Sequence, residues 1–372
     1  MGDSPWGELP IFICISTGRI FAAFFQYTIF MAFSTAYQAV VEKISLNKQL
    51  INNLFKVLVL LLPAIVLYYE LAGKDNLADI ASTFLKQLHN AHGWWLAGAV
   101  LLVPVNWLAE VQKWQPFVAR YEPMSQWKAL KAVLAGSSFA LFTPNRLGEY
   151  GGRILFVRPE NQWKALIANG VGSLSQYLVL LAGGVFGGVW FAGNMLEWSG
   201  QRLMYALILA FMPLCVLFYF NFNIRLFIPL LSRIPLLKRW ESLFREIHFL
   251  EKIDRRELAY VLVWSIFRYI VYSTQYVLLL QFFEINTTIS AGYAGVATIY
   301  LLQTVVPLPA LAGLLVRGSL AVFVWSHFGA NEICSLAATF VLWIINLILP
   351  ALLGTFSLYS VNITKSLGYD DD

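Results

Sequence analysis

The chain contains 372 residues, of which 59% are hydrophobic and only 13% are charged, with a formal net charge of +5. Ordinary soluble domains are about 45–50% apolar and about 25% charged, so this composition excludes a soluble globular protein. It also excludes a disordered chain, and the long continuous apolar runs exclude a transmembrane barrel of short alternating strands. The positive charge is attributed to loops that face anionic lipid, and no nucleic-acid partner is expected.

Continuous apolar runs mark the candidate membrane helices, because about 20 residues cross the roughly 30 Å hydrocarbon core of a bilayer. The clear runs are Leu54–Leu71, Trp94–Val111, Ala165–Ala192, Leu203–Phe220, Leu258–Phe283 and Ile333–Leu358. Another run, Ile11–Val40, carries several polar residues, so residues 1–45 are expected to form an N-terminal extension or an extra helix. The runs predict an all-α polytopic membrane protein with about six or seven full transmembrane helices.

Two other apolar regions are each interrupted by a proline-marked break. The first region consists of Ala132–Phe142, the break Thr143–Arg153 and the short piece Ile154–Val157. The second consists of Gly292–Val306, the prolines Pro307 and Pro309, the pair Arg317-Gly318 and the piece Ser319–Phe328. Proline removes a helical donor, and pieces of about eleven residues are too short to span. Both regions are therefore predicted to be re-entrant helical hairpins, whose broken backbone is stable only against protein or a polar cavity.

Lysine and arginine residues concentrate in the loops on one side of the predicted spans. The loop Asn221–Glu257 alone contains eight of them. Such loops are cytoplasmic in most membrane proteins, so this side, with the acidic tail 363–372, is expected to face the cytoplasm. The first hairpin then has its ends inside and the second outside, and two hairpins that enter from opposite faces suggest an inverted repeat within a membrane domain of residues 46–362.

Ionisable residues at membrane depth are the candidates for function. An arginine at the centre of a membrane helix costs at least about 2.5–3.5 kcal/mol, so it needs a partner or a role. Arg268 lies midway along Leu258–Phe283, and Tyr272 and Gln275 follow it on the same helical face. This polar stripe is interpreted as a contact for phosphate or carboxylate inside a cavity. The alternative is an arginine with a purely structural role, bonded to backbone carbonyls or to Glu149.

The two predicted hairpins carry further charged residues. Arg146, Glu149 and Arg153 lie in the first hairpin, next to glycines that let backbone N–H groups approach a ligand. Arg317 lies beside a glycine in the second. We predict that Arg153, Arg268 and Arg317 hold an anionic head group, and that Arg146 and Glu149 form the cytoplasmic mouth. The alternative for Arg146 is that it extends to the membrane surface.

The end of the second clear span carries Asn106 and Glu110 on one face. A structural role is expected for them, with Glu110 paired to Lys113 at the membrane interface. No nucleophile elbow, HExxH pair or P-loop occurs in the sequence. The protein is therefore not expected to be an enzyme, and no cofactor or metal site is predicted.

The stretch from Phe142 to Tyr150, Phe-Thr-Pro-Asn-Arg-Leu-Gly-Glu-Tyr, resembles the TPxRxGE-type motif of the lysylphosphatidylglycerol synthase transmembrane-region family, also called flippase-like domain proteins. The segments 106–114, 268–276 and 307–318 add to this resemblance, which is closest to stand-alone members of the Bacteroidota type. It implies a multi-pass protein of the bacterial inner membrane that translocates lipids such as aminoacylated phosphatidylglycerol or lipid-linked intermediates. The aminoacyltransferase domain of bifunctional members is missing from the sequence, so lysyl transfer is not expected.

Three functions compete on the sequence alone. The first is a translocator whose partner is a lipid with an anionic head group. The second is an integral-membrane transferase that acts on a polyprenyl phosphate or glycolipid, for which Glu110 and Glu149 are the available carboxylates. The third is an accessory protein that recruits an envelope-synthesis enzyme through its basic loop, and a homo-oligomer is also compatible with the sequence.

Overall fold

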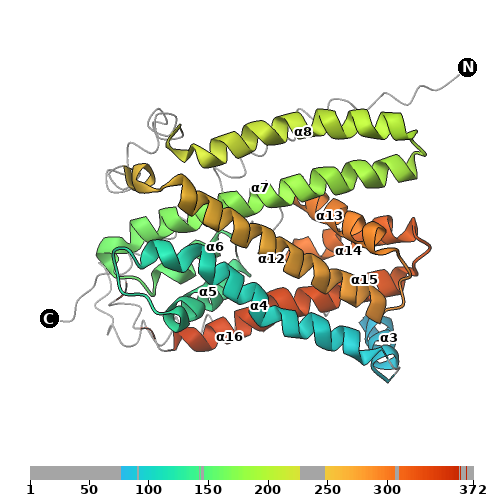
Figure 1. Cartoon of the computed structure of the whole chain (residues 1–372). Coiled ribbons are helices and arrows are strands. Elements are labelled where there is room, and N and C mark those ends of the chain that lie inside the picture. The colour runs from blue at the N-terminus through green and yellow to red at the C-terminus, as the bar shows by residue number, and fades with distance from the viewer. Residues whose placement is uncertain are drawn as a thin grey trace, which may run out of the picture. The chain divides into compact units, whose positions relative to one another are not determined.

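The structure is a computed structural model that describes residues 77–89, 92–141, 143, 146–226, 248–305, 310–359, 361 and 366. The runs Ile11–Val40 and Leu54–Leu71 and nearly all of the tail 363–372 lie outside these residues. The helices of the described part are α3 (Leu77–His89), α4 (Gly93–Val118), α5 (Gln126–Ala140), α6 (Gly148–Ile154), α7 (Gln162–Met195), α8 (Gly200–Phe222), α12 (Arg255–Phe282), α13 (Ile289–Val305), α14 (Ala310–Ser326), α15 (Glu332–Trp343) and α16 (Leu349–Leu358) (Figure 1). A π-helical turn, η5 (Ile344–Ile348), joins α15 to α16.

The prediction of an all-α polytopic membrane protein is confirmed. In the described part, four helical segments are long and apolar enough to cross a bilayer: Gly93–Val118, Pro159–Met195, Gly200–Phe222 and Glu332–Leu358. Only 6% of the residues in the most apolar stretch of α8 are buried, whereas 61% of those in the corresponding stretch of α15–α16 are buried. An apolar helix exposed along its length is stable when hydrocarbon surrounds it, so α8 is suited to face lipid, whereas α15–α16 lies in the protein interior.

Polar residues at the helix starts explain where several helices begin. The hydroxyl of Ser125 accepts from the N–H of Lys128 at the start of α5, at 3.1 Å. The side chain of Asn331 accepts from the N–H of Ile333 at the start of α15, at 2.8 Å. Each cap satisfies a backbone donor that has no partner in the first turn of a helix.

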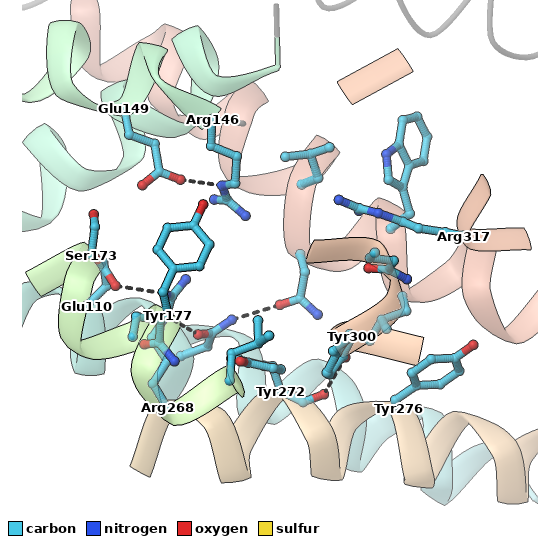
Figure 2. Close-up of a pocket in the computed structure, with 18 of the residues that line it drawn as sticks. Glu110, Arg146, Glu149, Ser173, Tyr177, Arg268, Tyr272, Tyr276, Tyr300 and Arg317 are labelled. Carbon is cyan, nitrogen blue, oxygen red and sulfur yellow. Dashed lines mark hydrogen bonds and ion pairs between the residues drawn. The ribbon is translucent and has the colours of Figure 1, made fainter. Parts of the chain in front are cut away.

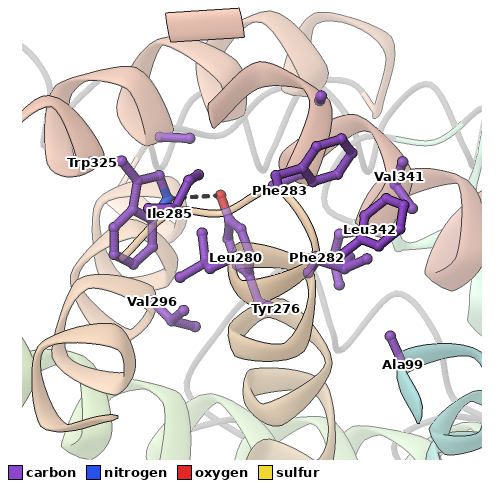
Figure 3. Close-up of a cluster of buried hydrophobic side chains, with 14 of the residues drawn as sticks. Ala99, Tyr276, Leu280, Phe282, Phe283, Ile285, Val296, Trp325, Val341 and Leu342 are labelled. Carbon is purple, nitrogen blue, oxygen red and sulfur yellow. Dashed lines mark hydrogen bonds between the residues drawn. The ribbon is translucent and has the colours of Figure 1, made fainter. Parts of the chain in front are cut away.

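The apolar core lies where α12 packs against α4, α13, α14 and α15 (Figure 3). Tyr276 is buried at its centre and contacts a neighbour on either side. Its hydroxyl lies 2.6 Å from the hydroxyl of Thr339 on α15 and accepts from the indole N–H of Trp325 on α14 at 3.3 Å. The buried hydroxyl is thus satisfied, and α12, α14 and α15 are held in one arrangement.

The first hairpin consists of α5 and α6, which are packed tightly against each other. A Cβ atom added to Gly152 would lie 2.6 Å from the carbonyl oxygen of Ala135, and one on Gly148 would collide with the carbonyl of Phe139. At the turn, the hydroxyl of Thr143 accepts from the N–H of Gly148 at 2.6 Å. Glycines therefore allow the backbones of α5 and α6 to pack in direct contact, and Thr143 satisfies the first backbone N–H of α6.

The second hairpin consists of α13 and α14, of 17 residues each. They are longer than the short pieces expected from the sequence, but at 1.5 Å per residue each is about 26 Å long, less than the hydrocarbon thickness. Helix α13 packs on α7, where Cβ atoms added to Gly184 and Gly187 would lie 2.6 Å from Leu301 and Ala297. That either hairpin is re-entrant in a bilayer remains a prediction.

The two hairpins have their bases at opposite ends of the described helices (Figure 1). Near the base of the first, Arg120 after α4 pairs with Glu257 at the start of α12, and Arg255 donates to Asn223 after α8 at 2.8 Å. At the other end, His92 before α4 lies 3.4 Å from Glu284 after α12. The loops rich in lysine and arginine lie at the end that contains the base of the first hairpin.

The order of elements supports the expected inverted repeat. A long helix, a hairpin and another long helix occur as α4, α5–α6 and α7, and again as α12, α13–α14 and α15–α16. Helices α4 and α12 run in opposite directions between the two ends (Figure 1). Which end faces the cytoplasm remains a prediction from the lysine and arginine distribution.

Candidate functional site

A cavity of about 320 Å³ lies between the two hairpins (Figure 2). Its wall is formed by side chains from α4, the first hairpin, α7, α12, the second hairpin and the segment around η5. Small-molecule sites usually measure about 300–1,000 Å³, so the cavity is large enough for a compact polar group. It is too small to enclose a lipid with its acyl chains.

Glu110 on α4 is the charged centre of the cavity wall. Its carboxylate lies 2.7 Å from Lys113 Nζ, 2.8 Å from Arg153 Nη2 and 2.8 Å from Arg268 Nη1. The expected pair with Lys113 is present, whereas its position relative to the membrane interface remains a prediction. Both side chains are buried, and Lys113 Nζ also donates to Gln176 of α7 at 3.0 Å. Glu110 therefore joins α4, α6 and α12 beside the cavity.

Arg268 lies on the cavity wall, and a chain of hydrogen bonds orients it. Its Nε donates to Asn106 Oδ1 at 2.8 Å, and Asn106 Nδ2 donates to Asn346 Oδ1 at 2.9 Å. Asn346 Nδ2 then donates to Gln275 Oε1 at 3.1 Å. Asn346 lies in η5, four residues before Pro350, which has no N–H to donate to the Asn346 carbonyl. The π-helical turn thus places an amide where it can fix an arginine.

Two predicted contact residues lie behind the wall and do not line the cavity. Arg153 is only 2% exposed, and it donates to Asn169 at 2.6 Å, Glu110 at 2.8 Å and Glu149 at 3.2 Å. Gln275 is fully buried and donates to the carbonyl of Ala99 at 3.0 Å. The structure thus gives Arg153 and Gln275 packing and positioning contacts, because both Arg153 Nη atoms and the Gln275 amide already bond to groups of the protein.

Tyr272, the third member of the predicted polar stripe, lies on the cavity wall. It packs edge-to-face against Tyr300 of α13, with ring centroids 5.2 Å apart, and the Tyr300 hydroxyl donates to the Tyr272 carbonyl at 3.4 Å. Tyr276 continues this aromatic side of the wall. One side of the cavity is therefore aromatic, and the side formed by α4 and α6 is charged.

Arg146 and Glu149 form an ion pair on the first hairpin, where both line the cavity. Arg146 has a φ of 60°, in the left-handed region that side chains other than glycine rarely occupy. Its side chain is 41% exposed, against 16% for Glu149. The turn therefore presents the arginine at an open part of the wall, and backbone strain of this kind is common at functional sites.

Arg317 reaches into the cavity from the second hairpin, on the side opposite Arg146 and Glu149 (Figure 2). Within the described part of the chain, it has no hydrogen bond or ion pair. The sequence offers it no nearby acid either, because residues 304–316 contain neither aspartate nor glutamate. Arg317 is thus the one predicted site arginine with no carboxylate beside it among the described residues.

Cationic side chains outnumber carboxylates in and beside the cavity. The described cations are Lys113, Arg146, Arg153, Arg268 and Arg317, and the described carboxylates are Glu110 and Glu149. Because Glu110, Lys113 and Arg153 are buried in the protein, the surplus charge attracts an anion more strongly than it would in water. The arrangement is suited to bind and orient an anionic group.

The sequence favoured a structural role outside the cavity for Glu110 and Lys113 because the apolar run ends at Val111, and it offered Glu110 as a site residue only under the transferase alternative. Helix α4 in fact continues to Val118, so Lys113 lies within the helix and not in the loop after it. The sequence did contain a signal for these two residues: they are ionisable, they lie three positions apart, and tryptophans stand on either side of the pair. Asn346 gave no comparable signal, since a single amide in an apolar run does not show which helix it will face.

The fold and the cavity define a helical membrane protein with a cationic site between two helical hairpins. The chain belongs to the family described as the lysylphosphatidylglycerol synthase TM region, whose model matches residues 53–354. This is the family that the motif at residues 142–150 indicated, and it links the protein to lipid handling in a membrane. Comparisons with curated proteins and with solved structures gave no match.

Proposed function

We propose that the protein is a flippase-like lipid translocator of the bacterial inner membrane, with its C-terminus in the cytoplasm. Its substrate is an anionic phospholipid, an aminoacyl-lipid or a lipid-linked intermediate. The observation that carries the proposal is a cavity with surplus positive charge between two hairpins whose bases lie at opposite ends of the helices. Transporters of inverted-repeat design hold their substrates at such a position.

The size and opening of the cavity support transport of the head group alone. About 320 Å³ accommodates a polar head group, while the acyl chains stay in the surrounding lipid. Leu147 and Tyr177 line the cavity and are 36% and 45% exposed, so the wall opens between the first hairpin and α7. The head group would enter there and contact Arg146 before it reaches Arg268.

Each hairpin contributes one arginine to the cavity, Arg146 from the first and Arg317 from the second. Movement of the first hairpin would open the site toward the end with the basic loops, and movement of the second would open it toward the other end. In this scheme the α4–α12 frame, joined by Glu110 and Arg268, stays fixed while the hairpins alternate.

The ion pairs favour transport over the transferase alternative. A general acid or base must be able to exchange a proton with the substrate. Glu110 is engaged by three cations and Glu149 by two, Arg146 and Arg153. Neither carboxylate is available as the acid–base group that a transferase would need, so we propose that no covalent step occurs.

A quenching assay tests the proposal. The purified full chain is reconstituted into liposomes with acyl-labelled fluorescent lipids of anionic or zwitterionic head group, and a membrane-impermeant reductant quenches the outer leaflet. Translocation predicts nearly complete quenching of anionic lipids, lost in Arg268→Ala. The control Arg202→Gln, an exposed arginine at the start of α8, should behave as wild type.

If about half of the label is quenched with every lipid, as expected for closed bilayers without transport, the translocator proposal is wrong. New head-group products in the extracted lipids would then support the transferase. If cells that carry the cavity variants behave like cells with the wild-type chain, the accessory role would be supported.

A further inference from the structure

We propose that the cavity selects a lipid whose head group ends in a phosphate monoester, in preference to a phosphodiester or an aminoacylated head group. This inference names the substrate class of the proposed translocator and rests on that function. A monoester carries a charge of about −1.5 to −2 near neutral pH and has three acceptor oxygens. The chemistry is shared by phosphatidic acid and by isoprenyl phosphates.

The first observation is that Arg146 and Arg317 point toward each other from opposite sides of the cavity (Figure 2). Arg146 has Glu149 at its side, whereas Arg317 has no partner among the described residues. The breaks of the two hairpins, residues 141–147 and 304–316, contain no acidic residue. The negative charge that balances these two arginines must therefore come from another part of the chain or from a ligand. The cavity volume leaves room for a ligand.

The second observation is the charge balance around the cavity. The two carboxylates are already shared among four cations, since Glu110 contacts Lys113, Arg153 and Arg268, and Glu149 contacts Arg146 and Arg153. With Arg317, the described groups carry three positive charges in excess. Charges removed from water are unfavourable unless they are paired, so a bound ligand is favoured in proportion to its negative charge.

The candidate head groups differ in this respect. A phosphodiester such as phosphatidylglycerol brings one negative charge, and an esterified amino acid adds at least one positive charge, which cancels or outweighs it. A monoester brings close to two. The cationic wall should therefore bind monoester lipids most tightly and aminoacylated lipids least tightly, although all of them carry a phosphate.

The third observation is that two arginines, Arg146 and Arg317, line the cavity where one phosphate would bind. A guanidinium binds phosphate oxygens in pairs, and Arg146 and Arg317 approach from opposite hairpins. The phosphorus of a diester carries two ester oxygens, which leaves two free oxygens to accept hydrogen bonds. A terminal phosphate leaves three, so it can contact both arginines while its single ester link points toward the opening at Leu147 and Tyr177.

Binding to the detergent-purified full chain tests the selectivity independently of transport. The probes are dihexanoyl phosphatidic acid, dihexanoyl phosphatidylglycerol and farnesyl phosphate, titrated by calorimetry. We expect each monoester to bind about tenfold more tightly than the diester, the value of one additional charge-assisted hydrogen bond. The more tightly bound of the two monoesters identifies the lipid source.

The variant Arg317→Gln should bring the affinities for monoester and diester close to each other, while the exposed-arginine control Arg202→Gln keeps the difference. A second measurement uses the wild-type chain and so does not depend on the folding of a variant. The second ionisation of a monoester lies at pH about 6, and no histidine lines the cavity. The preference for the monoester should therefore shrink between pH 8 and pH 5, with the diester as the reference at each pH.

Equal or tighter binding of phosphatidylglycerol, or a preference unaffected by both Arg317→Gln and pH, would overturn the inference. The translocator proposal would survive this result if quenching of anionic lipid is still complete. Conversely, selective monoester binding together with quenching of only half the label would support the site chemistry and overturn transport. The two failures are thus distinguishable.

Discussion

The guanidinium of Arg268 on α12 lies 2.8 Å from the carboxylate of Glu110 on α4, and both residues line the same cavity. The ion pair joins two long helices that run in opposite directions and pack closely along their length. Because Asn106 also accepts from Arg268, α4 supplies two acceptors to one guanidinium. The charged wall of the cavity is therefore part of the contact that holds the two helices together.

Replacement of the central carboxylate should destabilise the protein strongly. Glu110→Gln removes the negative charge that the buried Lys113 and Arg153 share with Arg268, and loss of one partner of a buried pair costs about 3–5 kcal/mol. The free energy of unfolding in mixed detergent micelles measures the effect. The matched control is Glu160→Gln, at an exposed glutamate, which should change it by less than about 0.5 kcal/mol. Similar values for both variants would show that the network does not stabilise the fold.

The amide chain from Arg268 to Gln275 should matter for binding as well as for folding. Asn346→Leu leaves Asn106 without its acceptor, so Arg268 loses its fixed orientation. We expect affinity for anionic lipid to fall about tenfold, while the free energy of unfolding falls by about 1–2 kcal/mol. Calorimetry and denaturation together separate the two effects. The control Asn194→Leu, at an exposed amide, should leave binding unchanged, and an equal loss there would refute the positioning role.

The close contact within the first hairpin can be tested with one methyl group. Gly152→Ala places a Cβ atom 2.6 Å from the carbonyl of Ala135, and overpacking of this kind costs about 1–3 kcal/mol. Gly170→Ala on α7 meets nothing within 4 Å and should be neutral or stabilising by up to about 1 kcal/mol. Thermal unfolding of both variants measures the difference. A neutral Gly152→Ala would mean that the hairpin is looser than described.

The two ends of the described helices should lie on opposite sides of the membrane. Single cysteines at Arg158, before α7, and at Arg202, at the start of α8, would probe these ends in a chain whose native cysteines are replaced by serine. An impermeant maleimide should label Arg202→Cys in intact cells and Arg158→Cys only after permeabilisation, because the basic loops lie at the Arg158 end. The reverse pattern would invert the proposed orientation.

The sequence by itself determined the class of protein and the position of its breaks. An apolar content of 59% requires lipid as the solvent, and the runs from Trp94 to Leu358 correspond to helices in the structure. The prolines and glycines of both interrupted regions predicted the hairpins, because these residues change backbone hydrogen bonding locally. The prediction that the two hairpins enter from opposite faces followed from counting the predicted membrane spans between them. Each of these features depends on neighbours along the chain.

Only the tertiary structure decided which charged residues share a site. Helical periodicity puts Arg268, Tyr272 and Gln275 on one face, yet it does not reveal that Gln275 meets Ala99 and is enclosed. It likewise does not show that Arg153 lies behind the wall or that Glu110 is its centre. Partners on α4, α6, α12 and η5 are distant in sequence, and their meeting depends on how whole helices pack. Charge balance across the cavity is therefore a property of the packed helices and not of any one segment.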